Sequence, residues 1–378
     1  MCMKPIQMVD LKQQYLTIKN EVDTAVLDVL ASSIFIGGPQ VNTFAEKLSQ
    51  YLGVKHVIPC ANGTDALQIA MMALGLEPGD EVITPSFTYV ATTEVIALLR
   101  LKPVFVEVDT QTFCVDIEAI KNAITPKTKA IVPVHLYGHS AKMEEIMAIA
   151  KEHNLFVIED NAQAIGGDYF FKNGSTKKTG SIGTIGCTSF FPSKNLGCYG
   201  DGGAMFTNDD ALAEKLKMIA NHGQKTRYYH DMVGCNSRLD AMQAAILNIK
   251  LPLLDTYIEA RRKAADFYDK AFAGNGKITI PYRADYCKHV FHQYTLILEN
   301  VDREGLVAFL AENNIPSMLY YPVPAHRQKM FAAFGGSNFI LEKTDWLTER
   351  VISLPIHTEL DEEQQIFITE KVLEFINK

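Results

Sequence analysis

Apolar side chains are spaced in two different ways along the first 160 residues. Over residues 11–30 they recur every three or four positions, which predicts a helix, and a second helix is expected from about 41 to 52. From residue 56, the short apolar runs "HVIPC", "EVITP", "PVFVEV", "KAIVPVHLYG" and "LFVIED" alternate with amphipathic segments. This alternation predicts an α/β fold, with a mostly parallel sheet and helices on both faces. Functional groups of such a sheet gather at the carboxyl ends of its strands.

The alternation stops after residue 160. Residues 161–207 are rich in Gly, Ser and Thr, and the short runs "CTSFF" and "GAMFT" are expected to be strands. A long helical segment follows from about 239 to 272, where Pro252 predicts a kink. A mixed region with the strand-like run "QYTLILEN" comes next, and a terminal helix ends the chain. We therefore predict a large domain over residues 1–250, including the N-terminal helical segment, and a smaller C-terminal α+β domain over residues 251–378.

Composition narrows the class of function. The 378 residues are 47% hydrophobic, enough for a large core, and a net charge of −8 without a basic tract argues against nucleic acid as a partner. No apolar run reaches the length of a membrane span, and the N-terminus lacks the apolar core of a signal peptide. The seven cysteines are scattered without C-x-x-C spacing, and no H-E-x-x-H occurs. We expect reduced thiols in a cytoplasmic protein, with no metal site.

One lysine raises a chemical question. Lys194 lies in "SFFPSKNLGCYGDGGA", between an aromatic pair and a run of glycines. Most lysines are solvated surface residues, so the rest of the sequence must decide whether this one is different.

A possible phosphate site lies in "CANGTDAL", residues 60–67, between an expected strand and the helix after it. Gly63 allows close approach of the backbone, and Thr64 and Asp65 suit the first turn of a helix. The free N–H groups and the dipole of a helix N-terminus favour a phosphate, although an ordinary capped turn would look the same. Neither G-x-G-x-x-G nor G-x-x-x-x-G-K-[ST] occurs, which argues against a dinucleotide site and a P-loop.

Two further motifs follow expected strands. In "VIEDNAQA", Glu159 and Asp160 end a very apolar strand, and Gln163 comes one helical turn later. In "PSFTYVAT", residues 85–92, an aromatic ring could cover a planar ligand. Alone, the first motif could be a solvated helix cap and the second simple packing. Pyridoxal phosphate uses all of these parts, because it needs a lysine, a carboxylate for its ring nitrogen, a phosphate cradle and a flat contact for the ring.

Longer motifs carry a resemblance to a known family. The stretches "SFFPSKNLGCYGDGGA", "CANGTDALQIAMMALGLEPGDEVITPSFTYVAT", "VIEDNAQAIG", "GCNSRLDAMQAAIL" and "ISLPIHTEL" resemble the DegT/StrS sugar aminotransferases over about residues 6–370. The resemblance implies fold type I of the pyridoxal-phosphate-dependent transferases, the architecture of aspartate aminotransferase, with the cofactor in the large domain. Within the family, the sequence is most similar to the aminotransferases of UDP-2-acetamido-2-deoxy-3-oxo-glucuronate, which serve the synthesis of surface polysaccharide such as lipopolysaccharide.

The same resemblance implies roles for the cofactor site. Lys194 matches the lysine that forms the Schiff base with pyridoxal 5′-phosphate, and Asp160 matches the partner of the ring nitrogen. Gln163 matches the residue near the ring hydroxyl, and Tyr89 the aromatic residue stacked on the ring. The implied phosphate ligands are Gly63, Thr64 and Ser189.

Substrate residues are implied in the same way. Asn236 matches a phosphate ligand contributed by the neighbouring subunit, which implies a homodimer with composite sites, and Arg238 faces the substrate there. A structural pair between Arg238 and Asp240 is the alternative. Tyr320 and Tyr321 are expected near the sugar, but many relatives have His where this chain has Tyr320, which weakens the assignment of the sugar.

The implied reaction is the transfer of an amino group from glutamate to a keto sugar. The cofactor would be left as pyridoxamine phosphate when 2-oxoglutarate leaves, and would then aminate C3 of the UDP-linked 3-oxo-hexuronate. A dTDP-linked 3-oxo- or 4-oxo-6-deoxyhexose is the alternative substrate. A non-catalytic regulatory protein on the same fold is an alternative of another class, but it would be expected to lack the lysine or the carboxylate.

Overall fold

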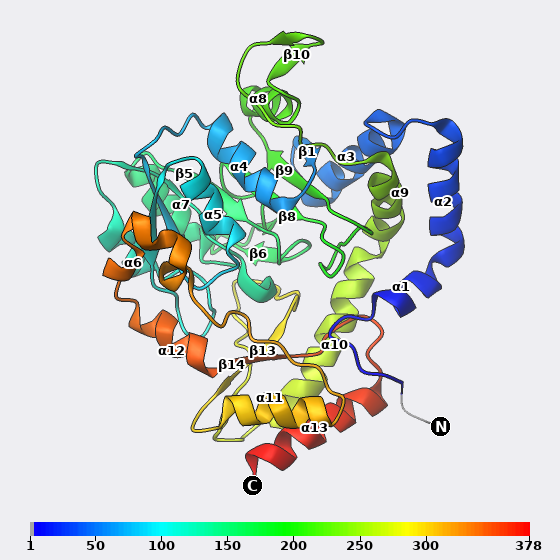
Figure 1. Ribbon diagram of the computed structural model, residues 1–378, viewed down its shortest axis with the longest axis vertical. Helices are drawn as coiled ribbons and strands as arrows, with labels where there is room; N and C mark the ends of the chain where they lie inside the picture. The colour runs from blue at the N-terminus through cyan, green and yellow to red at the C-terminus, as the bar shows by residue number, and fades with distance from the viewer. Residues whose placement is uncertain (1–3) are drawn as a thin grey trace.

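The computed structural model describes residues 4–378 and is built around a seven-stranded sheet with the order β1-β9-β8-β5-β4-β2-β3 (Figure 1). A three-stranded sheet, β12-β13-β14, and the two hairpins β6-β7 and β10-β11 complete the strands. The strands are β1 (His56–Cys60), β2 (Glu81–Pro85), β3 (Lys102–Val106), β4 (Thr128–Ile131), β5 (Phe156–Asp160), β6 (Asp168–Phe170), β7 (Thr176–Lys178), β8 (Ile185–Ser189), β9 (Gly203–Thr207), β10 (Gln224–Thr226), β11 (Tyr229–His230), β12 (Ile278–Thr279), β13 (Tyr294–Leu298) and β14 (Val351–Leu354).

The helices lie between the strands of the large sheet and at both ends of the chain. They are α1 (Leu11–Thr17), α2 (Lys19–Ser32), α3 (Gly38–Leu52), α4 (Gly63–Ala73), α5 (Ala91–Leu98), α6 (Ile117–Ala123), α7 (Met143–Glu152), α8 (Asp210–Ala220), α9 (Ala241–Lys250), α10 (Leu254–Phe272), α11 (Arg303–Glu312), α12 (Glu342–Arg350) and α13 (Glu362–Ile376). Several begin with a carboxylate cap, as the side chain of Asp116 does before α6 and that of Asp209 before α8.

The large sheet is mostly parallel, as predicted. The pairs β2·β3, β2·β4, β4·β5 and β5·β8 are parallel, and only β9 runs against its neighbours β1 and β8. Because β1 and β8 are both antiparallel to β9, they run in the same direction, and β1 ends at the same edge of the sheet as β5 and β8. This edge therefore collects the segments that follow Cys60, Asp160 and Ser189.

Both faces of this sheet are buried. Successive residues of a strand point to opposite faces, and Val82, Ile158 and Met205 pack into one apolar cluster with α4 and α8. Their neighbours Ile83 and Val157 pack on the other side with α6 and α7. Burial on both faces explains why these strands read as continuous apolar runs in the sequence.

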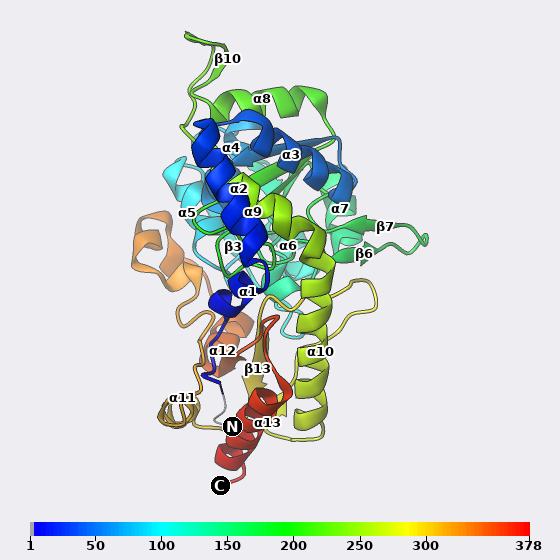
Figure 2. The same cartoon turned by 90° about the vertical axis from the view of Figure 1, so that its right-hand side faces the viewer.

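The three-stranded sheet has its own apolar cluster with α11 and α13, and α10 runs from one part of the molecule to the other (Figure 2). Leu254 and Ile258 at the start of α10 pack beside the large sheet, whereas Tyr268 and Phe272 at its end pack beside β13. A domain boundary at residue 250 stays a prediction.

Several expected elements differ in detail. The helix expected over 11–30 is two helices that meet at Ile18, and the long segment 239–272 is interrupted by a tight turn, Leu251–Leu253, that contains Pro252. Only the first three residues of the run "KAIVPVHLYG" belong to a strand, β4 (Thr128–Ile131). Helix α12, strand β14 and the two hairpins were not predicted, because they are short or lack strong periodicity.

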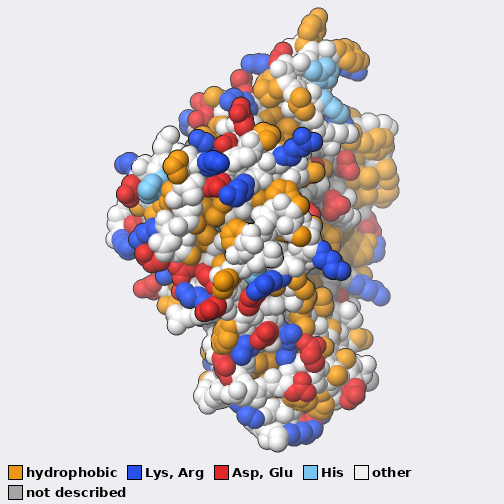
Figure 3. All heavy atoms as spheres, turned by 60° about the vertical axis from the view of Figure 1, so that its left-hand side comes forward, with side chains coloured by type: hydrophobic (Ala, Val, Ile, Leu, Met, Phe, Trp, Pro, Cys, Tyr) orange, Lys and Arg blue, Asp and Glu red, His pale blue; other side chains and the backbone are white. Residues whose placement is uncertain are grey.

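The surface drawn in Figure 3 carries acidic and basic side chains interspersed, with hydrophobic side chains between them. Over residues 4–378, no helix has the length and apolar character needed to cross a membrane.

Candidate functional site

A cavity of about 770 Å³ opens at the edge where β1, β5 and β8 end. We call it the lysine cavity, after Lys194 in its wall. The predicted site residues that line it are Gly63, Thr64, Tyr89, Asp160, Gln163, Ser189, Lys194, Tyr320 and Tyr321. Folding therefore brings together nine positions from five separate segments of the sequence.

The turn before α4 offers backbone donors to this cavity. The side chain of Asn62 accepts a hydrogen bond from the Asp65 N–H at 2.8 Å, and the first helical bond runs from Ala66 N to Asn62 O. The N–H groups of Gly63 and Thr64 precede that bond, so they have no acceptor within the helix. A Cβ on Gly63 would lie 2.7 Å from Ser189 Cβ, so only glycine lets the turn approach β8 this closely. The arrangement suits an anion such as a phosphate.

Lys194 lies in the turn that follows β8. Its N–H donates to Phe191 O at 2.8 Å, and the next residue, Asn195, anchors the turn by donating from Nδ2 to Val290 O at 3.0 Å. Burial lowers the pKa of the Lys194 ammonium to about 8, and the negative Asp160 opposes part of that shift. Within residues 4–378, no carboxylate lies within ion-pair distance of its Nζ. The amine is therefore available for chemistry near neutral pH.

The two carboxylates that end β5 point in opposite directions. Asp160 lines the cavity and is 5% exposed, with Oδ1 accepting from Ala162 N at 3.1 Å. Glu159 is completely buried on the other side and accepts from His135 Nε2 at 2.9 Å and from three backbone N–H groups. Burial opposes its charge, but these bonds outweigh the burial and hold the Glu159 pKa below its ordinary value. Asp160 is thus the carboxylate that can face a ligand, and Glu159 holds a loop.

Gln163 connects two walls of the cavity. Its Oε1 accepts from the Tyr137 N–H at 2.8 Å, and its Nε2 donates to the Tyr321 hydroxyl at 3.0 Å. The Tyr137 hydroxyl in turn donates to the carbonyl of Tyr320. Tyr89, across the opening, is 56% exposed, and its ring centroid lies 6.1 Å from that of Tyr321. An exposed aromatic ring at the mouth of a cavity is available to stack on a planar ligand.

Asn236 and Arg238 do not line this cavity. Both are exposed, and Arg238 donates to Asn221 Oδ1 at 3.4 Å beside a different hollow. Ser237 between them is buried and accepts from Ala61 N at 3.1 Å, which turns its two neighbours outward. In the described part of the chain, Arg238 forms no ion pair with Asp240, so the alternative pair is absent. Their contribution to a neighbouring subunit stays a prediction.

The sequence did not point to two residues at this site, Thr92 and His292, of which only His292 lines the lysine cavity itself. Thr92 touches Asp160 from α5, and His292 lines the wall with its Nδ1 atom buried and without a partner among the described residues. Burial and the nearby Lys194 hold the His292 pKa well below 6.5, so its imidazole is neutral. Thr92 closes the motif "PSFTYVAT", where it could have been noticed, whereas nothing in the spacing around His292 marks it.

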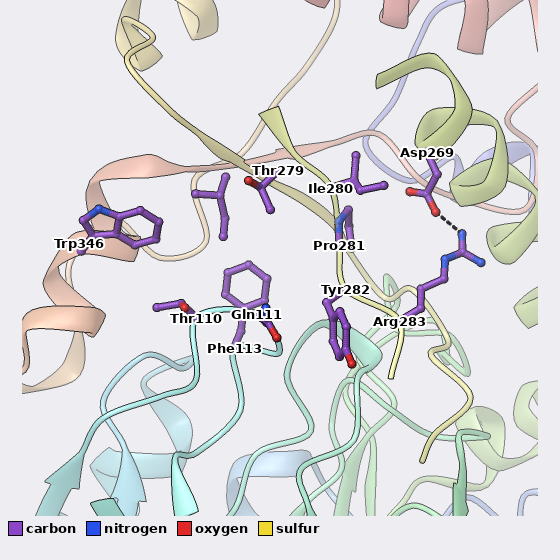
Figure 4. A pocket seen from close by; sticks show the side chains of 11 residues that line it. Thr110, Gln111, Phe113, Asp269, Thr279, Ile280, Pro281, Tyr282, Arg283 and Trp346 are labelled. Atoms are coloured by element: carbon purple, nitrogen blue, oxygen red, sulfur yellow. Dashed lines mark hydrogen bonds and ion pairs between the residues drawn. The ribbon is translucent and has the colours of Figure 1, made fainter. Parts of the chain in front are cut away.

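A second cavity, of about 520 Å³, contains none of the predicted site residues (Figure 4). We call it the tryptophan cavity, after Trp346 on α12. Phe113 and Tyr282 face the same space, and Arg283 lies at its rim. Arg283 is held by Asp269 at 2.6 Å and by Asp266 at 2.7 Å, so its charge is already neutralised.

Comparison with known proteins gives a consistent result over most of the chain. Residues 16–373 match the profile of the DegT/DnrJ/EryC1/StrS aminotransferase family. The chain is 48% identical to the "Pleiotropic regulatory protein" of Geobacillus stearothermophilus, with 98% of each sequence covered. It is 46% identical to the UDP-2-acetamido-2-deoxy-3-oxo-D-glucuronate aminotransferase of Pseudomonas aeruginosa, over 94% of this chain and 96% of that protein. It is 45% identical to the UDP-N-acetyl-3-dehydro-alpha-D-glucosamine 3-aminotransferase of Acidithiobacillus ferrooxidans, with 95% of each covered.

Solved structures agree with these sequences. The crystal structure of S. venezuelae DesV in complex with a ketimine intermediate superposes with a TM-score of 0.94 at 37% identity, and all of both chains is covered. The structure of NtdA from Bacillus subtilis with bound cofactor PMP superposes with a TM-score of 0.92 at 30% identity, over all of this chain and 86% of that one.

Proposed function

The chain belongs to the DegT/DnrJ/EryC1/StrS aminotransferase family, and from this premise we propose that it moves an amino group from glutamate to the keto carbon of a nucleotide-linked sugar. The family and the fold are those that the sequence motifs predicted. The observation that carries the proposal is the meeting of Lys194, Asp160 and the open N-terminus of α4 in one cavity.

The cofactor is pyridoxal 5′-phosphate, and the cavity has matching groups for each of its parts. The N–H groups of Gly63 and Thr64, together with the Ser189 hydroxyl, would hold the phosphate. Asp160 would face the ring nitrogen, and Tyr89 would cover the ring. When bound, the cofactor supplies an electron sink for the carbanion that forms at the substrate carbon.

The chain's own residues supply proton transfer and orientation. With a pKa of about 8, Lys194 Nζ can take a proton from a substrate carbon and return it near neutral pH. The Asp160 carboxylate keeps a negative charge beside the ring, and the bonds of Gln163 to Tyr137 and Tyr321 fix the wall opposite.

The proposed sugar is UDP-2-acetamido-2-deoxy-3-oxo-glucuronate, aminated at C3 for surface-polysaccharide biosynthesis such as that of lipopolysaccharide. Two of the relatives above are named for UDP-linked 3-oxo sugars, which supports this choice over a dTDP-linked 6-deoxyhexose. Arg238 supports a carboxylate, since a guanidinium binds a carboxylate through two parallel hydrogen bonds. A non-catalytic regulator is less well supported, because both Lys194 and Asp160 are present in one cavity.

A homodimer with composite sites is part of the proposal. Asn236 and Arg238 are exposed outside their own chain's lysine cavity, which leaves them free to complete that of a second copy. Ile34, Phe35 and Ile36 are 44–52% exposed, and burying such side chains would stabilise an association. The cytoplasm is the proposed compartment, which the six free cysteines of the described chain support.

The substrate is tested by offering the glutamate-loaded protein a panel of keto sugars and identifying the amino sugar by mass and NMR. The panel contains the UDP-3-oxo-hexuronate with a 2-acetamido group, its C6-methyl counterpart, and dTDP-linked 3-oxo- and 4-oxo-6-deoxyhexoses. We expect the uronate to have by far the highest kcat/KM. Arg238→Lys should narrow that preference, because a lysine ammonium cannot form the two parallel hydrogen bonds that a guanidinium forms with a carboxylate. Arg100→Lys, at an exposed position beyond α5, is the matched control. Equal use of the C6-methyl sugar would contradict recognition of the carboxylate.

The composite site is tested by mixing two inactive chains, Lys194→Ala and Arg238→Ala. A mixed dimer has one site with both defects and one site with neither, so activity should return. If subunit exchange is demonstrated and activity stays absent, each site is built from a single chain.

A further inference from the structure

A buried hydroxyl group contacts Asp160 from Thr92, a residue to which no role has been assigned. Thr92, in the first turn of α5, is 1% exposed, and its Oγ1 lies 2.7 Å from Asp160 Oδ2. The two residues are 68 positions apart in the sequence, so this contact exists only because α5 packs against the end of β5.

The direction of this hydrogen bond follows from its neighbours. The Thr92 hydroxyl has one proton and three acceptors within reach: Asp160 Oδ2 at 2.7 Å, and Tyr89 O and the Thr88 hydroxyl oxygen at 3.3 Å each. The carboxylate is nearer and charged, so the proton goes to Asp160. The hydroxyl of Thr88, 3.3 Å from that of Thr92, can then donate to Thr92 in turn. Two hydroxyls thus form a chain that ends on the carboxylate.

Few other groups act on Asp160. Its Oδ1 accepts only from Ala162 N at 3.1 Å, and over residues 4–378 Thr92 is its single side-chain donor. Three titratable groups face Asp160: Lys194 after β8, Cys187 on β8, and Tyr321 in the segment between β13 and β14. Burial raises the pKa of both the Cys187 thiol and the Tyr321 hydroxyl, so neither carries charge at neutral pH.

We propose that Thr92 is a positioning residue for the transfer reaction, and that its hydroxyl, by donating to Oδ2, holds the Asp160 carboxylate in one orientation. A hydrogen bond donated to a carboxylate favours the charged form, and an acceptor left without its partner in a nearly closed site loses that support. The inference rests on the proposed function, because Asp160 would face the ring nitrogen of the cofactor and would stabilise a proton there. Thr92 therefore acts through Asp160 and sets the strength of the electron sink.

The test compares variants that differ only in the hydroxyl. Thr92→Val removes it and keeps the shape, Thr92→Ser keeps it and removes the methyl group, and Thr92→Ala is a second variant without it. Thr93→Val is the matched control, because the adjacent residue Thr93 is as buried as Thr92 but its hydroxyl donates to Val90 O at 2.9 Å instead of to Asp160. Two readouts are measured on the protein with bound cofactor: kcat and KM for the glutamate half-reaction, and the pH at which the visible absorption band changes.

Thr92→Val and Thr92→Ala should lose roughly tenfold in kcat, with KM for glutamate within about twofold of wild type. The band should change at a higher pH in both, because a ring nitrogen that loses its proton no longer repels a proton on the nearby Lys194 linkage. Thr92→Ser and Thr93→Val should resemble wild type. In an Asp160→Asn background, Thr92→Val should produce no further change in the band.

Either of two results would overturn the inference. One is a Thr92→Val protein whose kcat and band titration equal those of Thr93→Val. The other is a Thr92→Ser protein as impaired as Thr92→Val, which would mean that Thr92 acts through the packing of its methyl group and not through its hydroxyl. A wild-type protein that acquires no visible band with pyridoxal phosphate would instead contradict the proposed function, so the two failures can be told apart.

Discussion

The lysine cavity and the tryptophan cavity both contain cationic and anionic side chains, but the charges are arranged in opposite ways. In the tryptophan cavity, Arg283 forms an ion pair with Asp269 (Figure 4). It forms a second ion pair with Asp266, and Asp269 also accepts from the Tyr294 hydroxyl at 2.8 Å. In the lysine cavity, Lys194 and Asp160 influence each other without forming an ion pair.

This difference separates a structural cluster from a reactive one. Charged groups that already form an ion pair gain little interaction energy from binding a ligand. An amine without an ion pair and with a lowered pKa, and a carboxylate with free lone pairs, can bind or react with a ligand. Size alone would not distinguish the two cavities, since each could hold a small molecule. If the distinction holds, substitutions in the lysine cavity should affect the reaction far more than substitutions in the tryptophan cavity.

Lys194→Ala should abolish turnover, a fall of about 10³-fold or more, because it removes the group that moves the proton. Borohydride should fix the cofactor to Lys194 in the wild type, as measured by mass spectrometry of peptides, and to no residue in the variant. Lys194→Arg should be equally inactive, because a guanidinium does not lose its proton in proteins. A Lys194→Ala protein with wild-type rates would mean that the lysine cavity is no more reactive than the tryptophan cavity.

Asp160→Asn should reduce kcat by roughly 10²-fold while cofactor occupancy falls far less, because the shape is kept and the charge beside the ring is lost. Kinetics and the visible absorption of the purified protein measure the two quantities. Asp269→Asn makes the same change in the tryptophan cavity and should leave kcat within about twofold of wild type. Similar losses in both variants would mean that the charge arrangement does not mark the site.

The amine of Lys194 should titrate near pH 8 in the cofactor-free protein, because burial lowers its pKa from 10.5 to about 8. Acetic anhydride should therefore label it about 10²-fold faster at pH 8 than an exposed lysine. Lys250 is the control: burial lowers its pKa to about 8 as well, but it is 1% exposed and donates to Gly197 O at 2.6 Å, so it should stay unlabelled.

The same shift has a consequence for stability. Between about pH 8 and pH 10.5 the unfolded chain binds more protons at Lys194 than the folded chain, so the stability of the cofactor-free protein should rise with pH across this window. Lys194→Met should remove that contribution to the slope, as measured by denaturant unfolding. An unchanged slope in Lys194→Met would mean that the amine has its ordinary pKa.

Arg283→Gln should have the smallest effect on the reaction. The change leaves Asp266 and Asp269 without their cation in a partly exposed place, so we expect a loss of about 1 kcal/mol in the free energy of unfolding. Turnover should stay within about twofold of wild type. A large loss of activity at unchanged stability would show that the tryptophan cavity takes part in the reaction.

The sequence predicted which residues meet at the edge of the large sheet better than it predicted where Asn236 and Arg238 lie. Gly63, Asp160 and Ser189 each end or follow a strand of the large sheet, and parallel strands bring such positions to one edge. Asn236 and Arg238 lie in an irregular segment, where no periodicity says which way a side chain points. The structure places them outside their own chain's lysine cavity. The spacing of neighbouring residues could not have predicted this position.

The sequence by itself determined the mostly parallel sheet, the helices on both faces and the set of chemical groups at its edge, because burial on one or both faces leaves a local pattern in the chain. Tertiary structure decided that Asp160 faces the cavity while Glu159 faces a loop, that Thr92 bonds a carboxylate 68 residues away, and that Arg283 is paired whereas Lys194 is not. Such contacts depend on which elements pack side by side and on where each side chain points. The spacing of residues along the chain records neither, because the contacting residues belong to segments far apart in the sequence.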